Sequence, residues 1–303
     1  MVPVTQSAFI FSAFAHDYGD HPGGKLPFFE QQFNLLMEAA SHLGDSPFAG
    51  LRYAAMKAPE DELATQYLTY LYSCAASRTL RSLQFTPAFT AGYSMGIYAA
   101  LFDAGVITFE TGLELIRLAF EAVSGQLKNR QFGMATVIGL DRRDIAQLIH
   151  QQGLEVEIAN RNAPHSFVVS GQSDHLVRFM EDARNEGALH VRDLEVSIPY
   201  HSRFLSLAAP EFDAKISHLK FSPAQTPILS LVDQVIVTSQ VSLRSEVSRN
   251  LFRSLDWLAT TEKLLALNTE LFVECGPSKG LTKNAKFIDG NFCFASLDTL
   301  EIT

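Results

Sequence analysis

One short segment constrains the fold of this chain more than any other: the Gly-x-Ser-x-Gly sequence that runs from Gly92 to Gly96. It follows the apolar run at 85–91 and precedes an alanine-rich stretch that begins at Ile97. This order predicts a strand, a sharp turn and a helix, the arrangement known as a nucleophile elbow. Glycine at both ends lets the strand and the helix approach closely, so Ser94 can expose its hydroxyl on a strained turn. Ser94 is therefore the candidate nucleophile.

The remaining sequence alternates predicted strands and helices, and the order changes in the middle of the chain. Residues 132–195 have the order β-α-β-β-α-β, which is typical of a small ferredoxin-like unit. Residues 1–131 and 196–303 show the strand–helix alternation of a larger α/β domain, including one long helical stretch at 243–267. The sequence thus predicts an α/β fold: a large domain made of 1–131 and 196–303, with a ferredoxin-like domain inserted at 132–195.

Composition excludes several classes of protein. A net charge of -9 disfavours nucleic acid and anionic membranes as partners, and the sequence shows no glycine-rich phosphate loop. The three cysteines, at 74, 275 and 293, lack metal-type spacing, so no metal site is predicted. The apolar runs are too short to cross a bilayer, and the N-terminal sequence lacks the basic flank of a signal peptide. We therefore expect a cytoplasmic protein.

A serine nucleophile needs a base, and His201 is the best-placed histidine. It follows the apolar segment 196–200, and so lies where a strand ends at the edge of an open α/β sheet. Two other arrangements remain open at this point. An ordinary α/β-hydrolase brings its histidine late in the chain, yet no histidine follows His218. A patatin-like Ser/Asp dyad would use Asp289, but the glycine-rich oxyanion loop of that group is missing.

The segment Gly92–Leu101 resembles the Gly-His-Ser-Leu-Gly-Glu-Tyr signature of malonyl-CoA:acyl-carrier-protein transacylases and polyketide synthase acyltransferases. Later blocks resemble that family in order and spacing: Ala104–Ile107, Ala159–Pro164 with Val168–Gly171, Val196–His201 and Val273–Leu281. The resemblance covers nearly the whole chain. It implies a stand-alone, trans-acting acyltransferase whose large α/β-hydrolase-like domain carries a ferredoxin-like insertion, in agreement with the element order above.

The resemblance also implies roles for individual residues. The nucleophile of the family corresponds to Ser94 and its general base to His201. A Gln-Trp pair, whose backbone carbonyl orients the histidine, corresponds to Asp256 and the tryptophan that follows it. The glutamine-containing oxyanion loop of the family is replaced in this chain. The expected oxyanion donors are therefore the backbone amides of Phe14 and Met95.

One departure from the family bears on the substrate. Malonyl-using members carry an arginine twenty-five residues after the serine, which holds the free carboxylate; this chain has Ala119 there, followed by Phe120. Arg117 lies on nearly the opposite helix face and is expected to pair with Glu114 and Glu121. A buried carboxylate without a cation is costly, so an uncharged acyl group is favoured. The expected pocket residues are Ala119, Phe120, Tyr200 and Asn162.

These features predict a serine acyltransferase that moves an acyl group between thioesters through an acyl-Ser94 intermediate. By resemblance, the donor is acyl-CoA or an acyl carrier protein, the acceptor is acyl carrier protein, and the pathway is polyketide or fatty-acid biosynthesis. No bound cofactor is expected, because both substrates carry their own phosphopantetheine arm. Three alternatives stay open: an acyl hydrolase that clears carrier proteins, a malonyl-specific transacylase, and a non-catalytic carrier-protein binder.

A basic surface for the carrier protein is predicted near the end of the sequence. Lys279, Lys283 and Lys286 recur at intervals of four and three, which places them on one face of the predicted final helix. Carrier proteins are acidic and this chain is acidic too, so docking needs a local basic patch of this kind.

Overall fold

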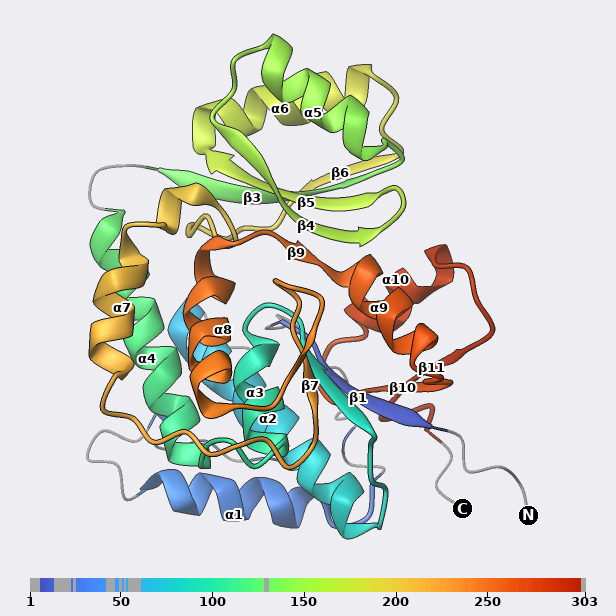
Figure 1. Ribbon diagram of the computed structural model, residues 1–303. Coiled ribbons are helices and arrows are strands. Elements are labelled where there is room, and N and C mark those ends of the chain that lie inside the picture. Colours follow the sequence, from blue (N-terminus) through green and yellow to red (C-terminus); the bar gives the residue numbers. More distant parts are fainter. Residues whose placement is uncertain are drawn as a thin grey trace.

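The computed structural model describes residues 6–13, 23, 26–41, 47–48, 51, 53, 61–127 and 131–300. These residues form two parts that lie one above the other, each built around its own β-sheet (Figure 1). The larger part contains a six-stranded sheet and most of the helices, and the smaller part contains a five-stranded sheet covered by two helices. Among the described residues, no helix combines the length and the apolar character that crossing a membrane would need.

The six-stranded sheet has β1 (Ser7–Phe11) near its centre, and every residue of this strand is buried. β1 pairs in parallel with β2 (Phe89–Gly92) on one side and with β10 (Leu271–Glu274) on the other. The outer strands are β11 (Cys293–Ser296) at one end, and β7 (Ile228–Leu229) and the antiparallel β8 (Ile236–Val237) at the other. Parallel strands bring their carboxyl ends to one edge, and there β2 leads into the predicted elbow.

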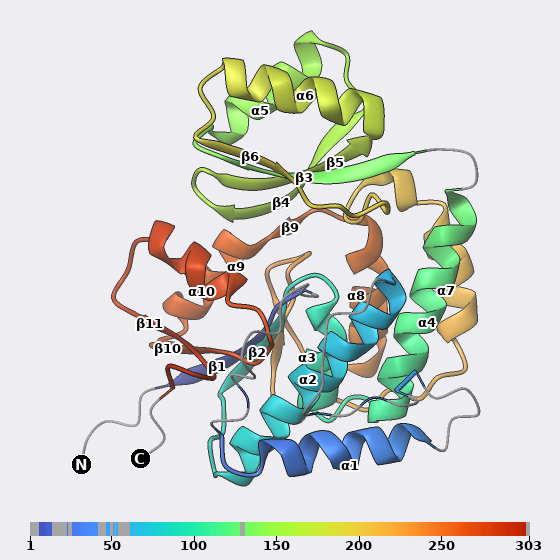
Figure 2. The ribbon, with the colours of Figure 1, turned by 180° about the vertical axis from the view of Figure 1, so that it is seen from behind.

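Alternate side chains of β1 face two different helical layers. Phe9 and Phe11 belong to the main core, whereas Ala8 and Ile10 belong to a second core. The main core includes residues of α1 (Phe29–Ser41), α2 (Glu62–Ser82), α3 (Gly96–Asp103), α4 (Phe109–Gln126), α7 (Ala208–Ile216) and α8 (Gln240–Phe252). The second includes residues of α9 (Trp257–Ala266) and α10 (Gly280–Asn284). Seen from behind, α9 and α10 lie on one side of the sheet and α2 and α3 on the other (Figure 2).

The smaller sheet is built from the middle of the chain. Its strands β3 (Phe132–Ile138), β4 (Val156–Ala163), β5 (Ser166–Gln172) and β6 (His190–Asp193) pair antiparallel in the order β6-β3-β5-β4. α5 (Arg142–Gln151) and α6 (Ser173–Asn185) follow β3 and β5 and pack on the sheet over a separate apolar core. This is the ferredoxin-like arrangement, so the predicted α/β fold with a ferredoxin-like insertion is confirmed.

The predicted long helix at 243–267 is wrong. α8 ends at Phe252, the short strand β9 (Leu255–Asp256) follows, and α9 comes next. β9 runs parallel to β4, so a strand from the large part extends the smaller sheet. The Asp256 side chain accepts a hydrogen bond from the Ala259 amide and caps α9. Continuous apolar periodicity across both helices hides this boundary in the sequence.

Candidate active site

Ser94 lies in the turn between β2 and α3, where the spacing of the two glycines places it. Its φ angle is +57°, in the left-handed region that residues with a side chain rarely adopt. A Cβ atom on Gly92 would lie 2.4 Å from the backbone of Ile97, and one on Gly96 would lie 2.2 Å from the Phe11 carbonyl oxygen. Both glycines are therefore required for the close crossing of strand and helix that presents the serine.

The imidazole of His201 lies against the Ser94 hydroxyl. The distance between Ser94 Oγ and His201 Nε2 is 2.7 Å, which is a hydrogen bond. The other ring nitrogen, Nδ1, lies 2.6 Å from the backbone carbonyl oxygen of Asn250. Because a carbonyl only accepts, we assign the ring proton to Nδ1, which leaves Nε2 free to accept the serine proton. The arrangement is that of a nucleophile and its base.

The end of α8 holds His201 in place. The last carbonyl groups of a helix have no partner within the helix. Two of them are used here: Asn250 O accepts from the His201 ring, and Leu251 O accepts from the His201 amide at 2.8 Å. His201 has a φ angle of +60°, so these two bonds fix it in a conformation that a free chain would avoid.

The assignment of Asp256 as the residue that orients His201 is wrong. The Asp256 carbonyl accepts hydrogen bonds from Gln234 Nε2 and Thr260 Oγ1 instead. The chain meets the histidine at the end of α8, before it enters β9. Because every residue has a backbone carbonyl, no residue type marks Asn250 in the sequence, and only the position of the helix end identifies it.

Burial keeps the His201 ring neutral. The residue is 2% exposed, and desolvation lowers its pKa from 6.5 to about 4, while the hydrogen bond to Asn250 acts in the opposite direction. A neutral imidazole is the form that accepts a proton, so His201 can act as a base throughout the neutral range. No carboxylate within the described part of the chain bonds to the ring, and the site is a dyad oriented by a carbonyl.

The amide of Met95 is available to bind an oxyanion. Met95 immediately precedes α3, and its N–H donates to no acceptor among the described residues. An amide next to the nucleophile, at the N-terminus of a helix, is well placed to stabilise negative charge on a substrate oxygen. Phe14, the other predicted oxyanion donor, lies outside the described residues.

A small cavity of about 20 Å³ lies beside the nucleophile. Three of the four predicted pocket residues, Ala119, Phe120 and Tyr200, are in its wall. None of the lining side chains that the structure describes carries a fixed charge. The lining residues are Gln66, Ser94, Met95, Tyr98, Ala119, Phe120, Tyr200, His201, Asn250 and Leu251. Across the described residues, no cluster of three or more His, Cys, Asp or Glu side chains is arranged to hold a metal ion.

Arg117 does not line this cavity. Its side chain is 41% exposed, lies 2.6 Å from Glu114 and also pairs with Glu121, as its helical spacing predicts. Both partners come from the same helix, α4, and are themselves partly exposed. The guanidinium is therefore occupied at the surface, and with Ala119 at this position no described residue supplies a cation to the cavity wall.

The fourth predicted pocket residue, Asn162, is not in the cavity wall, and this expectation is wrong. Asn162 Oδ1 accepts a 2.8 Å hydrogen bond from the hydroxyl of Tyr93, which in turn accepts one from Asn160 Nδ2. Both asparagines lie on β4, so two side chains of the smaller part hold Tyr93, which directly precedes Ser94 in the chain. The amide of Asn162 is used to satisfy a buried hydroxyl, which accounts for its absence from the cavity.

The three lysines predicted to dock a carrier protein do not share a helix face. α10 has only five residues: Lys279 precedes it, Lys283 lies within it, and Lys286 belongs to the 3-10 turn Ala285–Phe287 that follows. Lys279 also forms an ion pair with Asp298. The predicted single face is wrong, because the helix stops before spacings of four and three can align the side chains.

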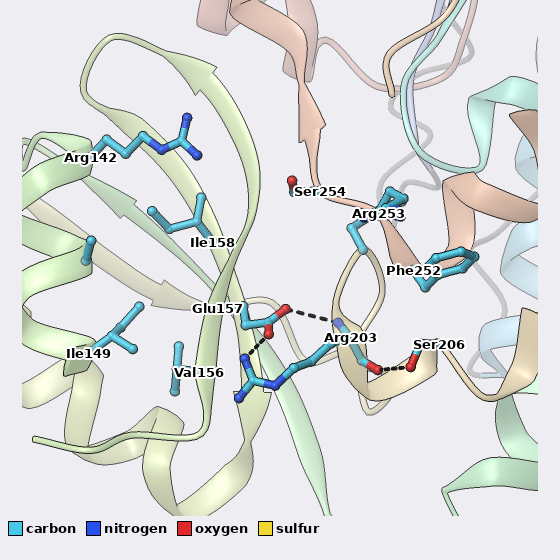
Figure 3. A pocket seen from close by; sticks show the side chains of 12 residues that line it. Arg142, Ile149, Val156, Glu157, Ile158, Arg203, Ser206, Phe252, Arg253 and Ser254 are labelled. Carbon is cyan, nitrogen blue, oxygen red and sulfur yellow. Dashed lines mark hydrogen bonds and ion pairs between the residues drawn. The ribbon is translucent and has the colours of Figure 1, made fainter. Parts of the chain in front are cut away.

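A larger groove, of about 610 Å³, includes His201 in its wall. Figure 3 shows other residues that line it. Arg142 borders it from the smaller part, and Arg203 and Arg253 border it from the larger part. Arg203 pairs with Glu157 of β4, whereas Arg142 and Arg253 form no ion pair within the described part of the chain. Sequence reasoning missed Arg142 and Arg253, because they are far apart along the chain and belong to no motif.

The sequence matches the family model described as "Acyl transferase domain" over residues 65–284. Among curated proteins, the malonyl CoA-acyl carrier protein transacylase of Staphylococcus aureus (strain MRSA252) is 28% identical to this chain over 240 residues. That alignment covers 78% of this chain and 77% of the relative.

Solved structures share the fold over nearly the whole length. The malonyl CoA-acyl carrier protein transacylase from Coxiella burnetii has a TM-score of 0.88 at 24% identity, with 97% of this chain and 94% of that chain covered. A malonyl-transacylase in complex with its type II polyketide synthase acyl-carrier protein gives a TM-score of 0.87 at 25% identity, with 98% and 97% covered. Because the family model spans most of the sequence, this chain belongs to the acyl transferase domain family and is an acyltransferase.

Proposed function

We propose that this enzyme moves a neutral acyl group from acyl-CoA or an acylated carrier protein to an acyl carrier protein, in fatty-acid or polyketide biosynthesis. The observation that carries the proposal is the 2.7 Å contact between Ser94 Oγ and His201 Nε2 in the elbow. Serine attack on a thioester needs a base, an oxyanion donor and room for the acyl group. His201, the Met95 amide and the adjoining cavity meet these three needs.

The reaction follows two half-reactions. His201 Nε2 takes the proton of Ser94 Oγ while that oxygen attacks the thioester carbon, and the Met95 amide donates to the resulting oxyanion. The C–S bond then breaks, and His201 returns the proton to the leaving sulfur, which leaves an acyl-serine. The thiol of the acceptor attacks this ester by the same steps in reverse, and Ser94 regains its proton.

Charge around the cavity favours a neutral acyl group. Ala119 contributes only a methyl group, and no described lining residue is cationic. Two other arginines already form ion pairs and are not free to bind a substrate carboxylate: Arg161 pairs with Asp256 at 3.5 Å, and Arg203 pairs with Glu157. A malonyl carboxylate would lose its hydration here without gaining a partner, at a cost on the order of several kcal/mol.

The arginine groove supports a substrate that carries phosphopantetheine. Arg142 and Arg253 are exposed on opposite walls of the groove that includes His201 (Figure 3). A guanidinium suits a phosphate, such as the one that joins pantetheine to a carrier protein. With a net charge of -9, the enzyme needs local cations to attract an acidic partner. One structural relative has been solved with its acyl-carrier protein bound.

The test is the mass of the intact protein after incubation with acetyl, malonyl and longer neutral acyl thioesters. We expect one acyl group on Ser94 and none on Ser94→Ala. His201→Ala should slow acylation by about three orders of magnitude or more, because the base is lost. Acylation of a cysteine or of another serine contradicts the assignment of the nucleophile, and faster acylation by malonyl than by acetyl contradicts the neutral specificity.

The fate of the acyl-serine separates transfer from hydrolysis. An acyl-enzyme that persists until a carrier-protein thiol is added is the result expected of a transferase. Rapid loss of the acyl group to water without a thiol acceptor would identify an acyl hydrolase on the same site. Failure of every thioester to acylate Ser94 would reject the proposal and support a carrier-protein binder.

A further inference from the structure

Two hydrogen bonds connect the start of α2 to Tyr200 in the wall of the acyl cavity, and a third joins the two α2 residues to each other. Tyr200 Oη donates to Glu62 Oε1 at 3.1 Å. Gln66 Nε2 donates to Tyr200 Oη at 3.1 Å and to Glu62 Oε1 at 3.3 Å. Asp61 caps α2 by accepting a bond of 2.7 Å from the Ala64 amide, which fixes Glu62 at the start of the helix. Glu62 and Gln66 are four residues apart and therefore lie on the same face of α2.

These bonds hold the Tyr200 ring in the wall of the cavity. Tyr200 and Gln66 line the cavity with Phe120 and Tyr98, whereas Glu62 is not a lining residue and reaches Tyr200 from behind the wall. The remaining space of about 20 Å³ holds one or two water molecules or a group of similar size, such as a methyl. An acyl chain longer than acetyl therefore requires a wall residue to move.

Tyr200 is the large wall residue whose position depends most on polar contacts. Phe120 has no polar group, and the Tyr98 hydroxyl bonds to no other described residue. The Tyr200 ring turns about two side-chain torsions, and contacts to its hydroxyl restrain both. Glu62 Oε1 accepts both from Tyr200 Oη and from Gln66 Nε2, the other partner of that hydroxyl, so Glu62 is the main anchor of the ring.

We infer that Glu62 is a positioning residue for acyl-chain length: by holding Tyr200 Oη it keeps the ring across the cavity and limits the enzyme to short acyl groups. The inference rests on the proposed function, since it concerns the acyl group that Ser94 receives. Glu62 takes no part in the chemistry and selects only by restraining Tyr200. This role accounts for an acidic side chain that stands behind the wall of an uncharged cavity.

The experiment compares Glu62→Leu with a matched control, Glu62→Gln, whose amide oxygen still accepts from Tyr200. For each protein, kcat/KM is measured with acetyl- and octanoyl-pantetheine, and the octanoyl-to-acetyl ratio is compared. We expect Glu62→Leu to raise this ratio about tenfold and Glu62→Gln to keep it within about twofold of the wild-type ratio. Tyr200→Phe, which keeps the ring and loses the hydroxyl, should raise the ratio as Glu62→Leu does, and the double variant should raise it no further.

An unchanged ratio in Glu62→Leu, with Ser94 still acylated and the thermal unfolding midpoint retained, would overturn the inference. An equal rise in the Leu and Gln variants would also overturn it, because the effect would then follow the charge of Glu62. If Glu62→Leu does not fold, Tyr200→Phe decides by the same ratio.

Failure of the proposed function gives a different result, in which wild-type Ser94 is acylated by no thioester. The length limit is then measured with ethyl and octyl fluorophosphonates, which label an activated serine directly. The octyl-to-ethyl labelling ratio should rise about tenfold in Glu62→Leu and stay within about twofold in Glu62→Gln. Equal ratios in all three proteins would overturn the inference on this route as well.

Discussion

At the scale of single residues, the site depends on two unusual backbone conformations and one buried ring. Ser94 and His201 have φ angles of +57° and +60°. Conformations of this kind cost on the order of 1–3 kcal/mol each and persist where the surrounding structure imposes them. The close strand–helix crossing imposes the first, and the carbonyl groups of α8 impose the second. Together they bring Ser94 Oγ and His201 Nε2 within hydrogen-bond distance.

The buried ring of His201 predicts a pH dependence of both rate and stability. Its pKa in the folded protein is about 4, below the ordinary value of 6.5, so the unfolded chain takes up the proton first as the pH falls. Above pH 6.5 the neutral His201 ring contributes roughly 3 kcal/mol to the free energy of unfolding. This contribution is lost as the pH falls from 6.5 to 4. Denaturant unfolding of wild type and His201→Gln across this range measures it, with the larger loss expected in wild type.

The rate of Ser94 acylation should follow the same group. We expect a nearly constant rate from pH 8 down to about 5 and a decline as the pH approaches 4, because the base stays neutral until then. Single-turnover acylation with a neutral thioester measures this profile. A midpoint near pH 6.5 would show that the ring is solvated in the working enzyme.

A second prediction at this scale concerns Ala119. Ala119→Arg should shift the preference between malonyl and acetyl thioesters toward malonyl by about 1.5 to 3 kcal/mol, because a cation then faces the substrate carboxylate. The ratio of kcat/KM values for the two thioesters measures the shift. Arg117→Gln is the matched control: its side chain pairs with Glu114 and Glu121 outside the cavity, so the ratio should not change. A loss of malonyl activity in the control would place Arg117 at the substrate.

At the scale of elements, the end of α8 orients His201, which is the role that a carboxylate has in a catalytic triad. Two carbonyl groups that the helix leaves unpaired bind the amide and the ring of His201. The position of β9 directly after this helix fixes where α8 stops, since the chain must turn to pair with β4. Orientation of the base therefore depends on a backbone path, and no acidic side chain is needed.

Asn250→Ala tests this reading of α8. The variant keeps the carbonyl that accepts from His201, and the lost Nδ2 group has no hydrogen-bond partner among the described residues. We expect the acylation rate to fall by no more than about fivefold, against about three orders of magnitude or more for His201→Ala. Single-turnover acylation of both variants gives the comparison. A loss above a hundredfold in Asn250→Ala would mean that its side chain acts on the reaction.

At the scale of the whole molecule, the groove exists because the two parts meet beside His201. Arg142 comes from the smaller part and Arg253 from the larger, and neither part alone would present both. The ion pair between Arg203 and Glu157 connects the same two parts. The contacts of Tyr93 with asparagines of β4 connect them again, close to the nucleophile. The site is thus assembled at a junction.

Charge reversal of the two exposed arginines, in the double variant Arg142→Glu and Arg253→Glu, tests the groove. We expect KM for an acylated carrier protein to rise about tenfold or more, and KM for a phosphate-free acyl-pantetheine to stay within about twofold. The effect should weaken as salt is added, because these cations are exposed. The matched control is Lys283→Glu with Lys286→Glu. A larger rise in KM in the control would mean that the carrier protein docks on the lysines instead. Equal losses of activity on both substrates would indicate damage to the active site.

The sequence by itself determined the features that depend on neighbouring residues. Gly92 and Gly96 mark the elbow because a Cβ at either position would collide with the backbone that crosses there. The order β-α-β-β-α-β identified the ferredoxin-like insertion, because helices and strands differ in apolar period. The prediction of a single helix at 243–267 was wrong because it relied on the same apolar period. Both helices of this stretch share one apolar pattern, and the strand between them is only two residues long.

Only the tertiary structure decided which distant groups meet. A backbone carbonyl has no signature in the sequence, so the role expected of Asp256 falls to Asn250. Asn162 lies in a segment that resembles the family, but its side chain bonds to Tyr93, because a buried hydroxyl needs a hydrogen-bond partner. Glu62 and Tyr200 are separated by more than a hundred residues, and only the packing of α2 beside the cavity brings them together. Local sterics act along the chain, whereas hydrogen bonds and charges act through space, where the fold sets the distances.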